Sequence, residues 1–175
     1  EIRRQINLKA DKESYQKMAA VTYVLQILHG IKVTDMNGSI VYKEANLGRY
    51  EQNFNPAYDR QEALFNTWLE ELNNAIAVLT NTNLPTQITY GSGDVMYAND
   101  WTKWAKLANS LKLRIAARLE NQDVNKTKAI FQEVMQSSVG AITTDDAQLS
   151  YQNYDYVGAG NDINYRSTRY GSTSI

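Results

Sequence analysis

Apolar side chains recur at every third or fourth position in four stretches of this chain, with polar side chains between them. This spacing places the apolar positions on one face of an α-helix, which has about 3.6 residues per turn. The predicted helices span residues 12–31, 59–80, 100–119 and 124–138. Together with the capping residues at their ends, the pattern predicts an all-α fold with almost no β-sheet.

The third stretch, residues 100–119, is the element around which we expect the rest of the chain to pack. Asp100 can accept hydrogen bonds from backbone N–H groups of the first turn, and no Gly or Pro interrupts the helix. One arc collects the apolar side chains, and we expect its two tryptophans, Trp101 and Trp104, to be largely buried. Lys112 falls inside this arc, so its ammonium must either reach solvent or meet a carboxylate.

Capping signals mark the ends of the other helices. Gly30 offers a left-handed stop for the first helix, where His29 would contact the last carbonyls rather than a ligand. Asp59 is predicted to cap the second helix, with Glu62 three residues later as in a capping box, and Asp123 is predicted to cap the fourth. In the fourth helix we expect four apolar side chains to face inward: Ile130, Phe131, Val134 and Met135.

A turn followed by a short extended segment is expected between the first two helices. Asn37 and Gly38 both tolerate positive φ, which makes the pair a strong turn signal, and Ile40 and Tyr42 alternate as in a strand. Asp35 with Asn37 and Gly38 also resembles the start of a calcium-binding loop. The remaining ligands of such a loop are missing, so a plain turn is the preferred interpretation.

Composition narrows the classes of function. The 175 residues suffice for one domain, and a net charge of −1 gives no field that favours nucleic acid or an acidic membrane. The absence of Cys excludes disulfides, zinc thiolate sites and cysteine nucleophiles, and a single His argues against a His-based metal site. No apolar run approaches the roughly 18 residues that a membrane span needs. We therefore expect neither a metal nor another cofactor.

The sequence indicates no pair of carboxylates for catalysis. Glu70 and Glu71 are neighbours on a helix and would point about 100° apart, so a solvated helix face is the preferred interpretation. A glycosidase needs two carboxyl groups held about 5–9.5 Å apart, and no spacing in the chain indicates such a pair. A hydrolase is therefore the least favoured of the functions considered, and we expect a protein that is not an enzyme.

The C-terminal stretch differs from the rest of the chain. We expect one domain over residues 1–175, with a helical core at about 12–138 and a loop region rich in Tyr, Asn and Gly at about 139–175. Tyrosine rings stack on the C–H faces of sugars while amides and acids bond hydroxyl groups. The candidate ligand-binding residues are Tyr151, Asn153, Tyr154 and Tyr156. The alternative is that these tyrosines only pack on the helices.

Several sequence blocks resemble, in the right order, the motifs of the SusD/RagB family, in the branch described as SusD-like, starch-binding associating with outer membrane. Residues 34–45 are similar to the family block T-D-x-x-G-x-I-P-Y-x-E-A, with Val41 in place of Pro. The other matching blocks are residues 56–62, 72–76 and 93–97, and the run W-x-K-W-A-K-L-A-N-S-L-K-L-R-I-A-A-R that begins at Trp101. The matched motif positions include Asp35, Gly38, Asp59, Trp101, Trp104, Asn109 and Arg114. These motifs look structural, so the resemblance identifies no sugar-binding residue.

The resemblance implies a core of tetratricopeptide-like helix pairs with long loops that carry the ligand surface, and no catalysis. Family members sit on the outer-membrane surface through a lipid anchor, as lids on a SusC-like TonB-dependent outer-membrane transporter. They pass oligosaccharides, or less often peptides, to that transporter. Since full members are two to three times longer, the resemblance also implies a central piece whose anchor lies elsewhere. The alternative is a helical-repeat scaffold that binds proteins and not glycans.

Overall fold

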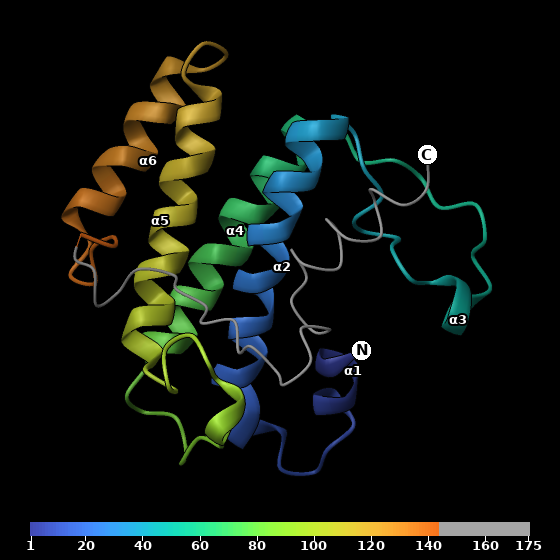
Figure 1. The fold of residues 1–175 in the computed structure, drawn as a ribbon, viewed down its shortest axis with the longest axis vertical. Helices are drawn as coiled ribbons and strands as arrows, with labels where there is room; N and C mark the ends of the chain where they lie inside the picture. The colour runs from blue at the N-terminus through green and yellow to red at the C-terminus, as the bar shows by residue number, and fades with distance from the viewer. Residues whose placement is uncertain (144–175) are drawn as a thin grey trace, which may run out of the picture.

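The structure is a computed structural model that describes residues 1–143 (Figure 1). The helices, in chain order, are α1 (Ile2–Asn7), the 3₁₀ helix η1 (Lys12–Tyr15), α2 (Gln16–Asn37), α3 (Gly48–Glu51), α4 (Gln61–Thr80), the 3₁₀ helix η2 (Gly91–Gly93), α5 (Trp101–Leu119) and α6 (Val124–Gln136). Among residues 1–143 the only β pairing is one antiparallel bridge between Ile40 and Asp59. The all-α prediction is confirmed.

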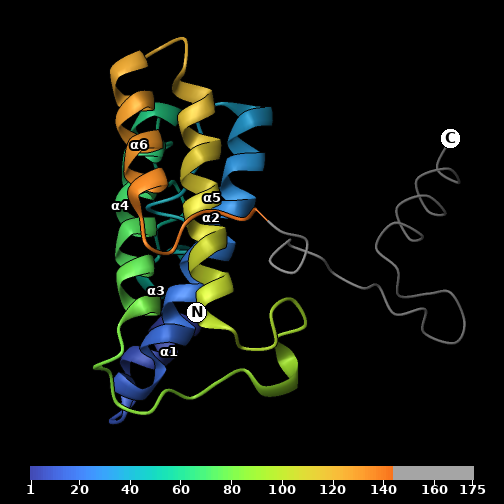
Figure 2. The ribbon, with the colours of Figure 1, turned by 90° about the vertical axis from the view of Figure 1, so that its left-hand side faces the viewer.

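The four long helices run up and down beside one another (Figures 1 and 2). Helix α4 packs against both α2 and α5, and α6 packs against α5. Helices α5 and α6 are antiparallel, as their short connection predicts (Figure 1). One long connection, residues 38–60, leaves the end of α2 and carries α3 away from the bundle before α4 begins (Figure 1).

Apolar side chains from all four long helices form the core. The indole of Trp68 on α4 is completely buried, and its neighbours in the core include Ile27 of α2 and Ile115 of α5. Trp68 packs against Phe65 with ring centroids 5.9 Å apart and against Tyr42 at 5.4 Å. Large rings of this kind contribute much of the apolar area that a small helical domain can bury.

The predicted N-caps of two helices are confirmed. The carboxylate of Asp100 accepts hydrogen bonds from the N–H groups of Thr102 and Lys103, and Asp123 accepts one from Lys126.

Inside the apolar arc of α5, the buried ammonium of Lys112 lies 2.7 Å from the carboxylate of Glu133 on α6. The charge is therefore paired across the two helices, which removes the cost of an isolated buried ammonium.

The predicted end of the first helix is wrong. Helix α2 continues through Gly30 and ends at Asn37. Its C-cap is Gly38, whose φ is 72° and whose N–H bonds to the carbonyl of Thr34. A Cβ at Gly30 would lie only 2.8 Å from the indole of Trp68, so the glycine permits close packing of two helices instead of ending one. His29 is an exposed residue inside this helix, and its Nδ1 lies 2.8 Å from the carbonyl of Leu25.

Two predictions of burial are also corrected. On α6, Ile130 and Val134 are buried, but Phe131 and Met135 are more than half exposed because, of the helices in residues 1–143, α6 packs against α5 alone. On α5, Trp104 is buried, whereas Trp101 at the first position of the helix is only partly covered. The short helices α1 and α3 are not predicted by the sequence pattern, since neither is long enough to show a helical period.

We predict that Gly30→Ala destabilises the protein. Alanine is the better helix former by about 1 kcal/mol. At this site, however, its Cβ would collide with the ring of Trp68, and overpacking a core costs about 1–3 kcal/mol. Urea unfolding of the variant and the parent measures the net effect.

The matched control is Gly93→Ala, because no atom lies within 4 Å of a Cβ at Gly93. That variant should unfold at nearly the parent urea concentration. A Gly30→Ala protein as stable as the parent, or more stable, would show that the two helices can separate at no cost.

Candidate functional site

The candidate ligand-binding residues Tyr151, Asn153, Tyr154 and Tyr156 lie outside the described residues 1–143. The structure does show what holds the chain shortly before them. The buried amide of Asn109 on α5 donates through Nδ2 to the carbonyl of Gly140, 2.9 Å away. The next residue, Ser110, accepts a hydrogen bond from the N–H of Ile142 at 2.9 Å. Two neighbouring positions of α5 therefore fix the path by which the chain leaves α6.

The loop before α5 is built around the carboxylate of Asp94. This side chain is buried and accepts hydrogen bonds from the backbone N–H groups of Met96, Tyr97 and Asn99 at 2.8–3.1 Å. The indole Nε1 of Trp104 donates a fourth bond to it, at 2.8 Å. The sequence places Asp94 in a family motif but gives no indication of this role, because the indole donor belongs to the following helix.

The environment of Asp94 decides its ionisation. Burial alone would raise the pKa of its carboxyl, but the hydrogen bonds from the Tyr97 N–H, the Trp104 indole, the Asn99 N–H and the Met96 N–H outweigh burial and lower that pKa below its ordinary value. Hydrogen bonds to a carboxylate favour its charged form. The loop therefore closes around an ionised carboxylate.

An ion pair of Asp35, in the motif block of residues 34–45, joins the end of α2 to α5. Asp35 forms a two-pronged ion pair with Arg118, whose Nε lies 2.6 Å from Oδ1 while Nη2 binds Oδ2. Arg118 also donates from Nη1 to the carbonyl of Arg114, whose own side chain is exposed. The hydrogen bond from Arg118 lowers the pKa of the Asp35 carboxyl. Asp35 is thus engaged with a guanidinium at the end of α2.

Asp59 does not cap α4, which corrects the sequence prediction. The N-cap residue is Arg60, and it makes no side-chain capping bond. The carboxylate of Asp59 instead accepts hydrogen bonds from the N–H groups of Tyr42 and Lys43, at 3.1 and 2.9 Å. Its backbone forms the bridge to Ile40. The side chain therefore closes the base of the long 38–60 connection, a contact between distant residues that capping rules do not consider.

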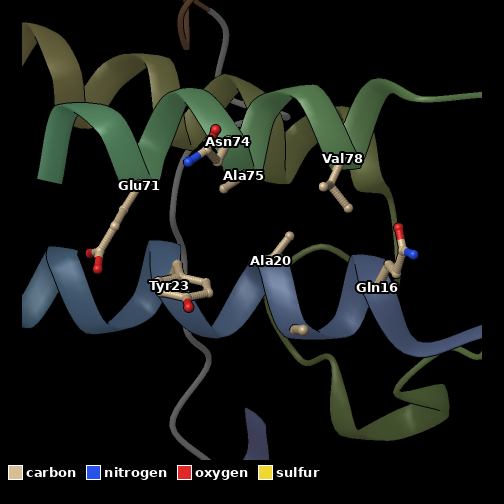
Figure 3. Close-up of a pocket in the computed structure, with 8 residues that line it drawn as sticks. Gln16, Ala20, Tyr23, Glu71, Asn74, Ala75 and Val78 are labelled. Atoms are coloured by element: carbon tan, nitrogen blue, oxygen red, sulfur yellow. The ribbon is translucent and has the colours of Figure 1, made fainter. Parts of the chain in front are cut away.

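A hollow of about 300 Å³ lies between α2 and α4 (Figure 3). Figure 3 shows Glu71 of α4 extending toward α2 beside the ring of Tyr23. One face of that ring is covered by the guanidinium of Arg3, 3.8 Å from the ring centroid. The other lining residues are Gln16, Ala19, Ala20, Asn74, Ala75 and Val78. An apolar floor with amide and carboxylate groups around it suits a small polar molecule.

Glu71 is not part of a solvated face, which is a second correction. Its carboxylate accepts a hydrogen bond of 2.6 Å from the hydroxyl of Tyr42, and the side chain is half-buried. Burial raises the pKa of the Glu71 carboxyl, although the Tyr42 hydroxyl and the charges of Arg3 and Lys43 oppose that shift. The adjacent Glu70 is exposed. The two carboxylates therefore differ in environment because only one of them faces α2.

Neither a metal-binding cluster nor a membrane-spanning helix is found among residues 1–143. Within residues 1–143, no three His, Asp or Glu side chains gather closely enough to hold a metal ion. None of the helices in that part of the chain has the length and apolar character that crossing a bilayer requires.

A sequence profile of the family described as "SusD-like: Susd and RagB outer membrane lipoprotein" matches residues 2–175, nearly the whole chain. The chain belongs to this family. The motif residues of this SusD-like chain therefore have an explanation in its structure: Asp35, Gly38, Asp59, Trp104 and Asn109 all bond or pack within the protein.

Solved structures show the same SusD-like fold. A SusD homologue from Bacteroides uniformis is 26% identical, with a TM-score of 0.71 over 94% of this chain and 36% of its own. A chitin-binding SusD homologue from Flavobacterium johnsoniae is 25% identical, with a TM-score of 0.70 over 81% of this chain and 28% of its own. A SusD homologue from Bacteroides vulgatus is 23% identical, with a TM-score of 0.70 over 95% and 31%. This chain thus spans about a third of the length of these relatives. No match is found among the curated proteins.

We predict that Asp94→Asn destabilises the protein at pH 7 by at least about 1.5–3 kcal/mol, the usual value of one hydrogen bond to a charged group. The folded-state pKa of Asp94 is lowered, so its contribution is complete above the unfolded pKa of about 3.9. That contribution disappears as the pH falls through the lowered folded-state pKa. The difference in unfolding free energy between parent and variant should therefore shrink in acid.

Asp11→Asn is the control, because Asp11 is exposed and makes no capping bond at the start of η1. Urea unfolding of all three proteins between pH 7 and pH 3 makes the comparison. A gap between parent and Asp94→Asn that stays constant over this range would mean that the charge of Asp94 does not stabilise the fold.

Proposed function

We propose that this protein is a non-catalytic glycan-binding component of a SusC/SusD-type nutrient uptake complex, held at the outer-membrane surface by a lipid anchor. The observation that carries this proposal is the family match over residues 2–175. A chitin-binding homologue among the similar structures supports an oligosaccharide or polysaccharide as the ligand, in preference to a peptide. The partner would be a SusC-like TonB-dependent transporter.

The motif residues bond within the protein, which supports a structural role for them and a binding role for loop residues. The carboxylate of Asp94 already accepts hydrogen bonds from three backbone N–H groups and one indole, so it has no capacity left for a ligand. Loops that leave a rigid helical scaffold are the usual carriers of binding residues. We therefore retain Tyr151, Asn153, Tyr154 and Tyr156 as proposed ligand residues, in the segment that follows the anchor formed by Asn109.

A second candidate is a helical-repeat scaffold that binds another protein. The observation in its favour is the outer face of α6, where Val124, Phe131 and Met135 are each more than half exposed. Exposed apolar side chains on one helix are typical of protein contacts. This candidate predicts binding of a protein with no affinity for glycans.

The test is affinity electrophoresis of the full-length protein in gels that contain single polysaccharides, including starch and soluble chitin. We expect retardation by at least one of them. Titration calorimetry with the matching oligosaccharide should then show that Tyr151→Ala, Tyr154→Ala or Tyr156→Ala weakens binding about 5- to 150-fold, the loss expected from about 1–3 kcal/mol of stacking.

The matched controls are the three Tyr→Phe variants, which keep the ring and should bind within a few-fold of the parent. Migration that no polysaccharide alters would contradict the proposed function. Unchanged affinity in all three alanine variants, with glycan binding intact, would place the ligand site elsewhere in the protein.

A further inference from the structure

The long connection between α2 and α4 presents aromatic rings to solvent. Phe54 is 80% exposed, Tyr58 73% and Tyr50 44%. The connection projects from the side of the helix bundle with α3 at its outer end (Figure 1). Rings this exposed add nothing to the core that residues 1–143 form, so their presence in a projecting loop needs another explanation.

The loop that carries these rings is held in one shape. Glu44 accepts hydrogen bonds through one carboxylate oxygen from the Nδ2 of Asn53, at 3.0 Å, and from the N–H of Ala57, at 2.9 Å. The Oδ1 of Asn53 in turn accepts a bond of 3.2 Å from the N–H of Asn55. With Asp59 closing the base of the connection, the rings are positioned before any ligand arrives. A pre-ordered surface loses less conformational entropy on binding.

A polar hollow of about 500 Å³ adjoins the rings. It is lined by Glu1, Asn46, Gly48, Arg49 and Tyr50. A Cβ at Gly48, one of the lining residues, would lie 3.4 Å from the ring of Phe54, so that ring lies beside one wall of the hollow. The guanidinium of Arg4 lies over the ring of Tyr50, 4.4 Å from its centroid, and that of Arg49 lies 5.5 Å from it. The Tyr50 hydroxyl donates to the carboxylate of Glu1. The hollow therefore brings together one ring, one amide and one guanidinium, those of Tyr50, Asn46 and Arg49, with the ring of Phe54 next to Gly48.

We propose that residues 46–58 form a binding site for a neutral oligosaccharide, with Phe54 and Tyr50 as the stacking rings. This inference rests on the function proposed above and assigns to it a site separate in sequence from Tyr151, Tyr154 and Tyr156. Sugar C–H faces cover exposed rings, while side-chain amides bond the hydroxyl groups.

The chemistry of the loop favours a neutral glycan over an anionic ligand or a protein. Arg49 and Glu1 line the hollow with opposite charges, so no excess positive charge would select an acid. The rings do not merge into one apolar patch, as a protein interface would need, because amide side chains alternate with them. These amide residues are Asn46, Gln52, Asn53 and Asn55.

The test uses the full-length protein and the neutral oligosaccharide that the parent binds best in the polysaccharide panel. Calorimetric titration should show Phe54→Ala and Tyr50→Ala binding about 5- to 150-fold more weakly than the parent. The thermal midpoint of Phe54→Ala should stay within about a degree, since so exposed a ring supports little core. Phe54→Tyr keeps the ring and should restore affinity to within a few-fold.

The matched control is Phe131→Ala, which removes the same side chain from an exposed position on α6 and should leave the dissociation constant unchanged. Parent-like affinity in both Phe54→Ala and Tyr50→Ala would overturn the site while leaving the proposed function standing. A parent that binds no glycan overturns both. An affinity loss that Phe131→Ala shares equally, or that accompanies a lower thermal midpoint and is not restored by Phe54→Tyr, overturns the site as well.

Discussion

The fold depends on one buried carboxylate. Placing the charge of Asp94 in the interior would be costly without partners, and three backbone N–H groups together with the indole of Trp104 supply them. Because Trp104 also belongs to the core, this cluster fixes the start of α5 relative to the loop before it. Helix α5 contacts α2, α4 and α6, so its position determines that of the whole bundle. The matched motif block of residues 93–97, which contains Asp94, thus has a direct physical role.

The sequence pattern correctly predicted the features that depend on neighbouring residues, namely the helices and two of their caps. The apolar period located the four long helices, and the carboxylates before α5 and α6 are caps as predicted. The errors arose where a distant residue decides the outcome. Gly30 lies within a helix because Trp68 packs against it, and Asp59 binds Tyr42 instead of capping its own helix. Phe131 has the correct spacing for burial, but the described part of the chain provides nothing for it to pack against.

The site was less predictable than the fold. The motifs identify the family, and the structure shows that they fold the chain: Asp35 pairs with Arg118, and Asn109 anchors the chain after α6. Such residues are constrained by intramolecular geometry, so they carry no information on the ligand. Tyrosine-rich composition indicated a ligand surface, yet its residues remain a proposal because they lie outside residues 1–143. The ring-bearing loop with Phe54 lacks any periodic signal, and only its exposure in the folded chain makes it visible.

We propose that the motif residues stabilise the fold while loop side chains bind the ligand. The most direct measurement is a paired one on Trp104→Phe in the full-length protein: urea unfolding together with calorimetric titration of the glycan that the parent binds. The variant keeps an aromatic ring but loses the indole donor to Asp94. We expect Trp104→Phe to lose about 1.5–3 kcal/mol of unfolding free energy and to keep the parent's dissociation constant for the glycan. An unchanged unfolding free energy combined with weaker glycan binding would contradict these separate roles of motif and loop residues.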